Sequence, residues 1–433
     1  MRCQIVHPQA DQLIYEIRQI VLIARRLEAA GVEMTWENIG DPCAKGEPVP
    51  EWIKEHFIAV IRRDKSWAYS PSKGLDETRA FLAAALNKRG GVQITPEDVY
   101  FYNGLGDAVA KLYRYLNPAV RVLCPSPSYS IHATHESFNA NRPPLVYHLD
   151  PANGWLPDPD EIRRLVKQHS EVAGVLLINP DNPTGLVWPE ELVRAVVEIA
   201  QEFGLFVIAD EIYNRLTYNG KKATLLAQVI GDRPGIALKG VSKEYPWPGG
   251  RCGWLEVYNE KSDPVFARYV RSLFDAKMIE VCSTTQPQMT IPIVFDDSRY
   301  LVHLQARCSA YEARSRQFAE NFAGIGGVQA TRPDGAFYAC VTFDKGVLND
   351  RQSLPVENRQ AKKILEEALA AGKLSPDKRL ALYLLAATGI CVVPLTGFSS
   401  SLHGFRMTLL EQDDDKRAKT LKTLREKIEE YIK

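Results

Sequence analysis

The sequence has no excess of charge of either sign, no long apolar run and no clustered cysteines. Lysine plus arginine number 53 and aspartate plus glutamate number 53 among 433 residues, so the formal net charge is zero. A dedicated nucleic-acid-binding protein normally carries a basic excess or stripe, which this composition lacks. No apolar window is long enough to cross a bilayer, and the N-terminal residues lack the apolar core of a signal peptide. We therefore expect a cytoplasmic protein with neither nucleic-acid nor membrane partners.

Cysteine is sparse and scattered. The eight cysteines stand singly, at positions 3, 43, 124, 252, 282, 308, 340 and 391. Without CxxC pairs they offer no zinc site, and we expect no metal. This spacing is typical of a reducing compartment with buried single thiols. The hydrophobic share of 45% and the charged share of 24% are those of packed globular proteins, which excludes disordered, collagen-like and coiled-coil chains.

Helical periodicity marks the two ends of the chain. We expect an amphipathic helix over 13–30, ended by Gly31, then a Gly- and Pro-rich loop. Near the other end we expect a helix over 300–321, a strand in PDGAFYACVTF and a charged surface helix within 349–378. The last helix covers 413–433 and is capped by Asp413.

The middle of the chain alternates short apolar runs with amphipathic stretches. The runs are Val99–Tyr102, Val122–Cys124, Val175–Ile178, Leu205–Ala209, Ile236–Leu238 and Gly253–Val257. Continuous apolar runs are typical of strands buried on both faces of a mostly parallel sheet. The fold class is therefore α/β, with a large helix-covered sheet and a smaller α+β domain built from both chain ends. We expect an N-terminal arm and part of the small domain in 1–60, the large domain in 61–310, and the rest of the small domain in 311–433.

Several predicted strands end in residues that bear chemistry, at the sheet edge where α/β proteins bind ligands. One ends in Asp210, which either caps a helix or holds a protonated ring nitrogen, since a carboxylate there needs a partner. Another leads through Ser242 to Lys243, and a rigid Pro- and Gly-rich segment connects Lys243 to Arg251. A desolvated amine can form a Schiff base, and a guanidinium can bind phosphate.

Two further strand ends carry stiff or glycine-rich loops. NPDNPTG contains two Asn-Pro units, which force extended geometry and aim the Asn182 side chain as a hydrogen-bond donor. NGLGD, with Gly104 and Gly106, opens a helix whose free backbone N–H groups can face an anion. Glycine turns are common, so this motif indicates an anion site only together with the charge of Arg251.

The sequence resembles the class I and II aminotransferases, which have the aspartate aminotransferase fold (fold type I). The resemblance lies in the order and spacing of three motifs: NPDNPTG, ADEIY, and SK followed by GGRCGW. The resemblance runs from about Ile39 to Met407. It implies pyridoxal 5'-phosphate as the cofactor. Lys243 resembles the lysine that forms the Schiff base and moves the substrate proton. Asp210 resembles the acid that pairs with the pyridine nitrogen, and Tyr213 and Asn182 resemble the residues that bond the phenolic oxygen.

The same resemblance implies the remaining contacts. Tyr129 resembles the aromatic residue that stacks on the ring, and Tyr69 the one that reaches the phosphate of a neighbouring subunit in a homodimer. Arg406 resembles the arginine that binds the substrate α-carboxylate, and Gly40 the small residue that lets the N-terminal segment close. The phosphate site would contain Gly104, Leu105, Gly106, Ser242 and Arg251.

Leu395 and the segment 349–378 depart from the family pattern, and we expect both near the substrate entrance. We expect an aminotransferase that moves an amino group from an alanine- or aspartate-type donor to a 2-oxo acid, with 2-oxoglutarate favoured, by a ping-pong mechanism. A C–S or β-elimination lyase on the same scaffold stays open. A sensor domain of a transcription regulator is disfavoured, because the residues before Trp36 are too few for a DNA-binding module.

Overall fold

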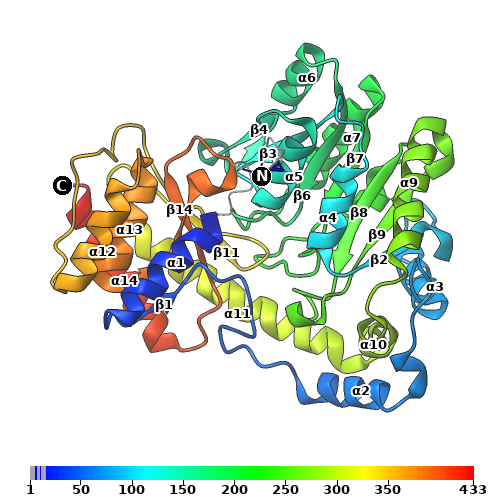
Figure 1. Cartoon of the computed structure of the whole chain (residues 1–433), viewed down its shortest axis with the longest axis horizontal. Coiled ribbons are helices and arrows are strands. Elements are labelled where there is room, and N and C mark those ends of the chain that lie inside the picture. The colour runs from blue at the N-terminus through cyan, green and yellow to red at the C-terminus, as the bar shows by residue number, and fades with distance from the viewer. Residues whose placement is uncertain (1–4, 7–9, 11–15) are drawn as a thin grey trace.

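The computed structural model describes residues 5–6, 10 and 16–433 (Figure 1). The first described helix is α1 (Glu16–Ala29), so the predicted start at Leu13 lies outside the described residues, as does Cys3. The predicted end is confirmed, with Gly31 in a positive-φ turn two residues beyond the helix. Within the described part of the chain, no helix is long and apolar enough to span a bilayer.

The larger part of the molecule is built on an eight-stranded sheet. Its central strands β8, β7, β6, β3 and β4 are parallel, and the outer strands β2, β9 and β5 run antiparallel to their neighbours. In spatial order the strands are β2 (Val99–Tyr102), β9 (Gly253–Tyr258), β8 (Gly235–Gly240), β7 (Phe206–Asp210), β6 (Val172–Ile178), β3 (Arg121–Ser126), β4 (Val146–Asp150) and β5 (Leu156–Pro157).

Both faces of this sheet are buried, which explains the continuous apolar runs. In β6, Val175 and Leu177 belong to one hydrophobic cluster, whereas Leu176 and Ile178 belong to another on the opposite face. Successive residues of a strand point to opposite faces, so every position must be apolar when helices cover both. The six predicted strands are confirmed, most of them extended by one to three residues.

Helices cover the sheet on both sides (Figure 1). Val109 and Leu112 of α4 pack in the cluster with Leu176, and Val193 and Val197 of α7 pack in the cluster with Val175. The helices of this part are α2 (Glu51–Ile61), α3 (Asp76–Asn87), α4 (Leu105–Arg114), α5 (Ser130–Ala140), α6 (Pro159–Gln168), α7 (Glu190–Phe203), α8 (Leu226–Val229), α9 (Pro264–Glu280) and α10 (Thr285–Asp296).

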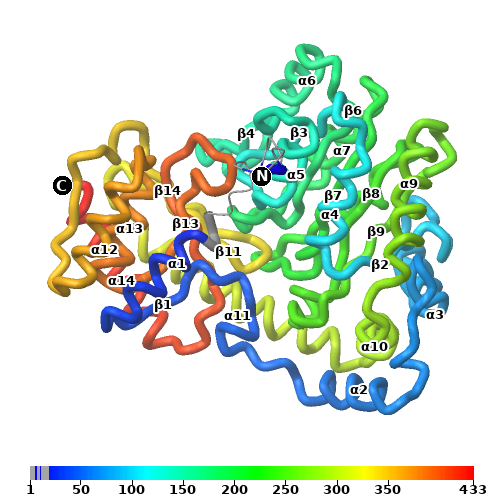
Figure 2. The backbone as a smooth tube through the Cα atoms, in the orientation of Figure 1, coloured from blue at the N-terminus to red at the C-terminus, as the bar shows by residue number. Residues whose placement is uncertain are grey.

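The smaller part is assembled from both ends of the chain, as predicted. In Figure 2 the blue N-terminal segment lies beside the orange and red C-terminal segments. Strand β1 (Thr35–Trp36) pairs in parallel with β12 (Ile390–Cys391). An antiparallel sheet contains β10 (Val328–Gln329), β11 (Tyr338–Phe343), β14 (Gly404–Thr408) and β13 (Val393–Pro394), and the helices are α1, α12 (Arg359–Ala370), α13 (Pro376–Thr388) and α14 (Asp414–Tyr431).

The 25-residue helix α11 (Ser298–Phe322) connects the two parts (Figure 1). Near its middle, Arg307 donates to the main-chain oxygen atoms of Lys243 and Glu244, at 2.7 and 2.8 Å. Two turns later, Arg314 donates to the oxygen of Leu409, at 2.9 Å, just after β14. The helix therefore contacts both parts directly. The residue limits 60/61 and 310/311 of the two domains remain predictions.

The charged segment 349–378 does not line the main cavity, and neither does Leu395, which is fully buried. Their expected place at the substrate entrance is therefore wrong. Helix α12 instead buries Ala361, Ile364 and Leu365, because its apolar residues form one stripe that packs against the other helices of the small part. Its charged face is exposed, as predicted for a surface helix.

The C-terminal helix and the cysteines test two smaller predictions. Asp413 caps α14 by accepting a hydrogen bond from the N–H of Lys416, as expected. The cysteines of the described residues are free thiols. Burial is confirmed for Cys124, Cys252, Cys340 and Cys391, whereas Cys282 and Cys308 are only partly buried. Cys43 is exposed because it lies in the loop before α2.

Candidate active site

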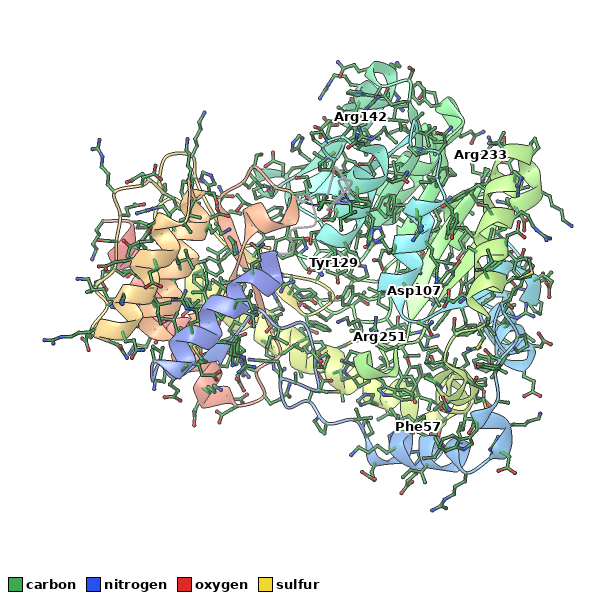
Figure 3. The ribbon with its side chains drawn as sticks, viewed as in Figure 1. Phe57, Asp107, Tyr129, Arg142, Arg233 and Arg251 are labelled. Atoms are coloured by element: carbon green, nitrogen blue, oxygen red, sulfur yellow. The ribbon has the colours of Figure 1, made fainter. Side chains whose placement is uncertain are left out.

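One cavity of about 960 Å³ lies where the carboxyl ends of the large sheet face the small part. Side chains from both parts line it, so the interface between the two forms the site. Of the thirteen predicted site residues, those on its wall are Gly40, Leu105, Gly106, Tyr129, Asn182, Asp210, Tyr213, Ser242, Lys243, Arg251 and Arg406. Figure 3 shows Tyr129, Asp107 and Arg251 in the middle of the molecule, between the two parts.

Lys243 follows β8 and extends its amine into the cavity. Its Nζ donates a hydrogen bond of 2.6 Å to the main-chain oxygen of Gly40, which comes from the N-terminal segment. Burial lowers the pKa of Lys243 to about 8, against the opposing effect of Asp41 and with the help of Arg406 and Arg251. Roughly a quarter of the amine is then uncharged at pH 7.5, compared with roughly a thousandth for an ordinary lysine. Lys243 is thus suited to act as a nucleophile and a base.

Asp210 lies at the end of β7, and its carboxylate faces the cavity. A hydrogen-bonded turn follows rather than a helix, so the helix-cap interpretation of Asp210 is wrong. One carboxylate oxygen accepts from the N–H of Ile212 at 3.2 Å. The other lies 3.1 Å from Nε2 of the buried His132. These contacts fix the carboxylate at a position where it can hold a positively charged ring nitrogen.

Arg251 and the start of α4 lie together, in an arrangement that can hold an anion. Gly104 precedes the helix with φ +86°, and a Cβ atom there would lie 2.5 Å from Nη2 of Arg251. Only glycine therefore permits the guanidinium to pack against this turn. The first N–H groups of a helix have no acceptor within it, and Leu105 and Gly106, which begin α4, line the same cavity as Ser242. Gly104 itself is not on the cavity wall but shapes it.

Arg406, on β14, is the most deeply buried cation of the cavity, with 2% of its surface exposed. Its guanidinium donates to the side-chain oxygen of Asn182 at 3.3 Å and to the main-chain oxygen of Asn38 at 2.6 Å. Nε has no hydrogen-bond partner, and within the described chain no carboxylate pairs with this arginine. A buried cation without a counter-charge is costly unless an anion binds beside it.

Aromatic side chains form the rest of the wall. Tyr213 donates a 3.2 Å hydrogen bond to the hydroxyl oxygen of Tyr338, and burial raises its pKa well above the usual value. The Tyr338 ring lies beneath the Arg406 guanidinium, 4.4 Å from its central carbon. It also leaves no room for a side chain at Gly40, since a Cβ atom there would collide with the ring. Tyr129 precedes α5 and borders the same space.

Tyr69 is the predicted site residue that the structure does not bring to the cavity. Its side chain is 85% exposed, in the segment between α2 and α3. Within one chain Tyr69 does not line the cavity that contains Arg251.

Sequence reasoning missed Tyr338, Asn38 and Arg25 on the wall, and it missed His132, which is buried and contacts Asp210. His132 and Arg25 lie on amphipathic helices, where nothing in the local pattern distinguishes them. Tyr338 lies on the strand predicted in PDGAFYACVTF. That strand pairs with β14, which carries Arg406, and this pairing is the feature that could have identified Tyr338.

The fold and this wall of residues define the chemistry of a family. The chain belongs to the class I and II aminotransferases, whose family model matches residues 34–421. Members of that family are pyridoxal-phosphate enzymes that bind amino acids and 2-oxo acids. The chain is 50% identical over its whole length, and over all of the relative, to an uncharacterized aminotransferase of Methanocaldococcus jannaschii.

Other relatives carry more specific names. The glutamate-pyruvate aminotransferase of Escherichia coli is 29% identical over 82% of this chain and 87% of its own. The solved alanine aminotransferase of Pyrococcus furiosus covers 99% of both chains with a TM-score of 0.83 at 26% identity. The aspartate aminotransferase of Thermus thermophilus, solved with maleate, shares the fold with a TM-score of 0.76 over 95% of this chain and 96% of its own, at 22% identity.

Proposed function

We propose that the protein is a pyridoxal 5'-phosphate-dependent aminotransferase that moves the amino group of an alanine-type donor to 2-oxoglutarate. The observation that carries this proposal is the buried Arg406, which has a free Nε and no carboxylate partner in the described chain, in the same cavity as the amine of Lys243. An amino acid can bind to both residues at once. Its α-carboxylate can neutralise the charge of Arg406 while its amino group lies toward Lys243.

The residues present fit the cofactor. Arg251, Ser242 and the first turn of α4 offer a cationic, N–H-rich site for its phosphate. Asp210, fixed by His132, would hold the ring nitrogen, and Asn182 and Tyr213 would bond the phenolic oxygen. When bound, pyridoxal phosphate supplies an aldehyde that reacts with amines and a ring that withdraws electrons from the substrate Cα.

The chain's own groups then bind the substrate and move its proton. Arg406 would bind the α-carboxylate, with Asn182 and the oxygen of Asn38 fixing the guanidinium. Lys243, uncharged in part near neutral pH, would take the proton from Cα and return it at another atom. Tyr129 and the loop of Gly40 would keep water away from the reacting atoms.

The relatives support the substrates. The named enzymes at 26–29% identity are a glutamate-pyruvate aminotransferase and an alanine aminotransferase. One cavity with one deeply buried arginine also suits a ping-pong cycle, in which the donor leaves as a 2-oxo acid before the acceptor binds in its place. Elimination of a β-substituent on the same scaffold is not favoured, since the relatives named above are aminotransferases.

A homodimer would explain Tyr69. The side chain is almost fully exposed in one chain, and Trp67, two residues away, is also 75% exposed. We propose that this segment packs on a second copy, where Tyr69 reaches the phosphate site of the neighbour. Light scattering of the purified protein gives the number of copies directly.

The function is tested by spectroscopy of the holoenzyme. We expect visible absorbance from bound pyridoxal phosphate that disappears when alanine or glutamate is added and returns with pyruvate or 2-oxoglutarate. Unchanged absorbance with every amino acid of a full panel would overturn the aminotransferase proposal. Release of ammonia and pyruvate from a cysteine conjugate without any oxo acid would favour the lyase instead.

A further inference from the structure

Helix α11 contains a buried arginine that contacts the chain at the reactive lysine. The Arg307 side chain is 5% exposed. Its Nη1 donates to the main-chain oxygen atoms of Lys243, at 2.7 Å, and Glu244, at 2.8 Å. A guanidinium presents its N–H groups in one rigid plane, whereas the amine of a lysine is a single point charge on a flexible stem. Arg307 therefore fixes the backbone at the residue that carries the amine.

The same guanidinium also bonds to Glu47 and Tyr311. Nε of Arg307 donates to one carboxylate oxygen of Glu47, and Nη2 donates to the hydroxyl oxygen of Tyr311 at 3.1 Å. The Tyr311 hydroxyl donates to the other oxygen of Glu47 at 2.6 Å. All three side chains are buried. A buried polar network whose members bond to one another in this way is rigid. We refer to Glu47, Arg307 and Tyr311 as the buried triad.

Glu47 belongs to the N-terminal segment that reaches the cavity. Its N–H group donates to the main-chain oxygen of Pro42 at 2.9 Å, which closes the loop between them. Gly40, two residues before Pro42, supplies the oxygen that accepts from Nζ of Lys243 at 2.6 Å. Lys243 is therefore held at both ends. Arg307 holds its main chain, and the segment that Glu47 anchors holds its amine.

We propose that Arg307 is a positioning residue for Lys243. Through the buried triad it fixes how far the amine reaches from its own main chain toward the oxygen of Gly40. This inference rests on the proposed function, because there the amine of Lys243 reacts with the cofactor and moves the substrate proton. A displacement of about 1 Å in such a group can lower the rate about a hundredfold. An amine that leaves its buried place also regains water, which favours its charged form.

Charge is a second route by which Arg307 acts on Lys243. Burial is the main cause of the low pKa of Lys243, and the charged groups that also act on it are Asp41, which raises the pKa, and Arg406, Arg251 and Arg307, which lower it. The titratable groups that interact with Arg307 in the described chain include Glu47, Tyr311, Cys43, His303 and Cys308. Arg307→Lys keeps the positive charge and removes the planar fork, so this variant separates position from charge.

Labelling of the full-length protein without cofactor tests the inference. An amine-acylating reagent is applied over a range of pH, and mass spectrometry follows the peptide that contains Lys243. The wild type should be half labelled near pH 8. In Arg307→Lys we expect the midpoint to rise by about one pH unit, toward the ordinary lysine value, because the amine is no longer held in its buried place. A midpoint that stays near pH 8 would show that only charge matters and would overturn the positioning role.

Steady-state kinetics of the holoenzyme supply a second readout. Arg307→Lys should lower kcat by about 10- to 100-fold and leave the KM for alanine within about threefold, because Arg406 still binds the α-carboxylate. A merely structural role would reduce the amount of folded enzyme without changing kcat or the labelling midpoint of the folded fraction. If Arg307→Lys does not fold, Tyr311→Phe decides, since it removes only the hydroxyl of the buried triad. Its midpoint should rise by about half a pH unit or less, and an unchanged midpoint would overturn the inference.

The matched control is Arg314→Lys, which makes the same change two turns later on α11. Arg314 is also buried, but it donates to the main-chain oxygen of Leu409 at 2.9 Å and to the side chain of Gln412 at 3.0 Å. It is not among the charged groups that act on Lys243. The labelling midpoint of this variant should stay near pH 8. An equal rise in Arg314→Lys and Arg307→Lys would indicate a general disturbance of α11 and would overturn the specific role of Arg307.

The labelling experiment needs neither cofactor nor turnover, so its failure differs from that of the proposed function. If the wild type converts no amino acid while Arg307→Lys still raises the midpoint, the aminotransferase proposal fails and the positioning of the amine stands. If the wild type transfers amino groups and the midpoint does not move, only the positioning role fails.

Discussion

Lys239 and Lys243 lie four residues apart, one on β8 and one in the loop that follows, and both amines are shielded from bulk water. Lys239 has two buried carboxylates beside it, Glu256 at 2.8 Å and Glu211 at 3.4 Å. Burial opposes its charge, but these two carboxylates outweigh it and raise the pKa of Lys239. Burial lowers the pKa of Lys243 to about 8; three nearby arginines act in the same direction, and Asp41 opposes them.

The difference shows that burial alone does not make a lysine reactive. A paired amine stays charged and serves the fold, whereas an amine surrounded by cations is partly neutral and can react. Two residues that line the cavity, Asp210 and Lys243, are each followed by a buried glutamate that does not line it, Glu211 and Glu244.

The largest expected effect is on catalysis. Lys243→Ala should lower kcat by at least about 10⁴-fold, because the group that moves the proton is gone. Its free energy of unfolding without cofactor should not fall below that of the wild type at pH 7, because the variant removes a buried charge that opposes folding. The pKa of Lys243 is lower in the folded state, so its charge opposes folding below pH 8, and stability rises from pH 8 toward 10.5. Steady-state kinetics and urea unfolding measure the two quantities.

The second effect is on stability. Lys239→Met should lower the free energy of unfolding by about 3–5 kcal/mol, because it leaves Glu211 and Glu256 buried without their cation. Urea unfolding of the apoprotein measures this loss. Equal losses in Lys239→Met and Lys243→Ala would show that the two lysines do not differ in role.

The smallest expected effect concerns the pKa of the Lys243 amine. In the apoprotein, labelling of Lys243 by an amine-acylating reagent should reach half of its maximum near pH 8. Asp41→Asn should move this midpoint down by about one unit or less, because Asp41 is the carboxylate that raises the pKa. Mass spectrometry follows the labelled peptides, and Lys239 should stay unlabelled throughout. An upward shift in Asp41→Asn would contradict the electrostatic explanation.

The sequence predicts the site residues that lie at the ends of strands. It does not predict the residues that reach the site from helices when the two parts of the molecule pack together. Asp210, Lys243 and Asn182 follow buried apolar strands, and parallel strands deliver their carboxyl ends to one edge. His132 contacts Asp210 across 78 residues, and Arg25 comes from a helix near the other end of the chain. Their own segments show only amphipathic periodicity, and the contacts that give them a role exist only after the two parts assemble.

The prediction that segment 349–378 lies at the substrate entrance was wrong for a related reason. Its charge indicated exposure correctly, but charge says nothing about which neighbour the apolar stripe packs on. Through Glu367 it contacts α1, which contributes Arg25 to the cavity wall.

Helix α11 sets the spacing between the amine of Lys243 and the guanidinium of Arg406. Arg307 fastens the backbone at Lys243, and Arg314 fastens the chain just after β14, which carries Arg406. Seven residues make almost two full turns, so both guanidinium groups leave the helix on nearly the same side. One residue inserted between them would turn one contact by roughly 100° relative to the other. The length of this helix, counted in whole turns, therefore helps to determine the geometry of the cavity, although none of its side chains lines the cavity.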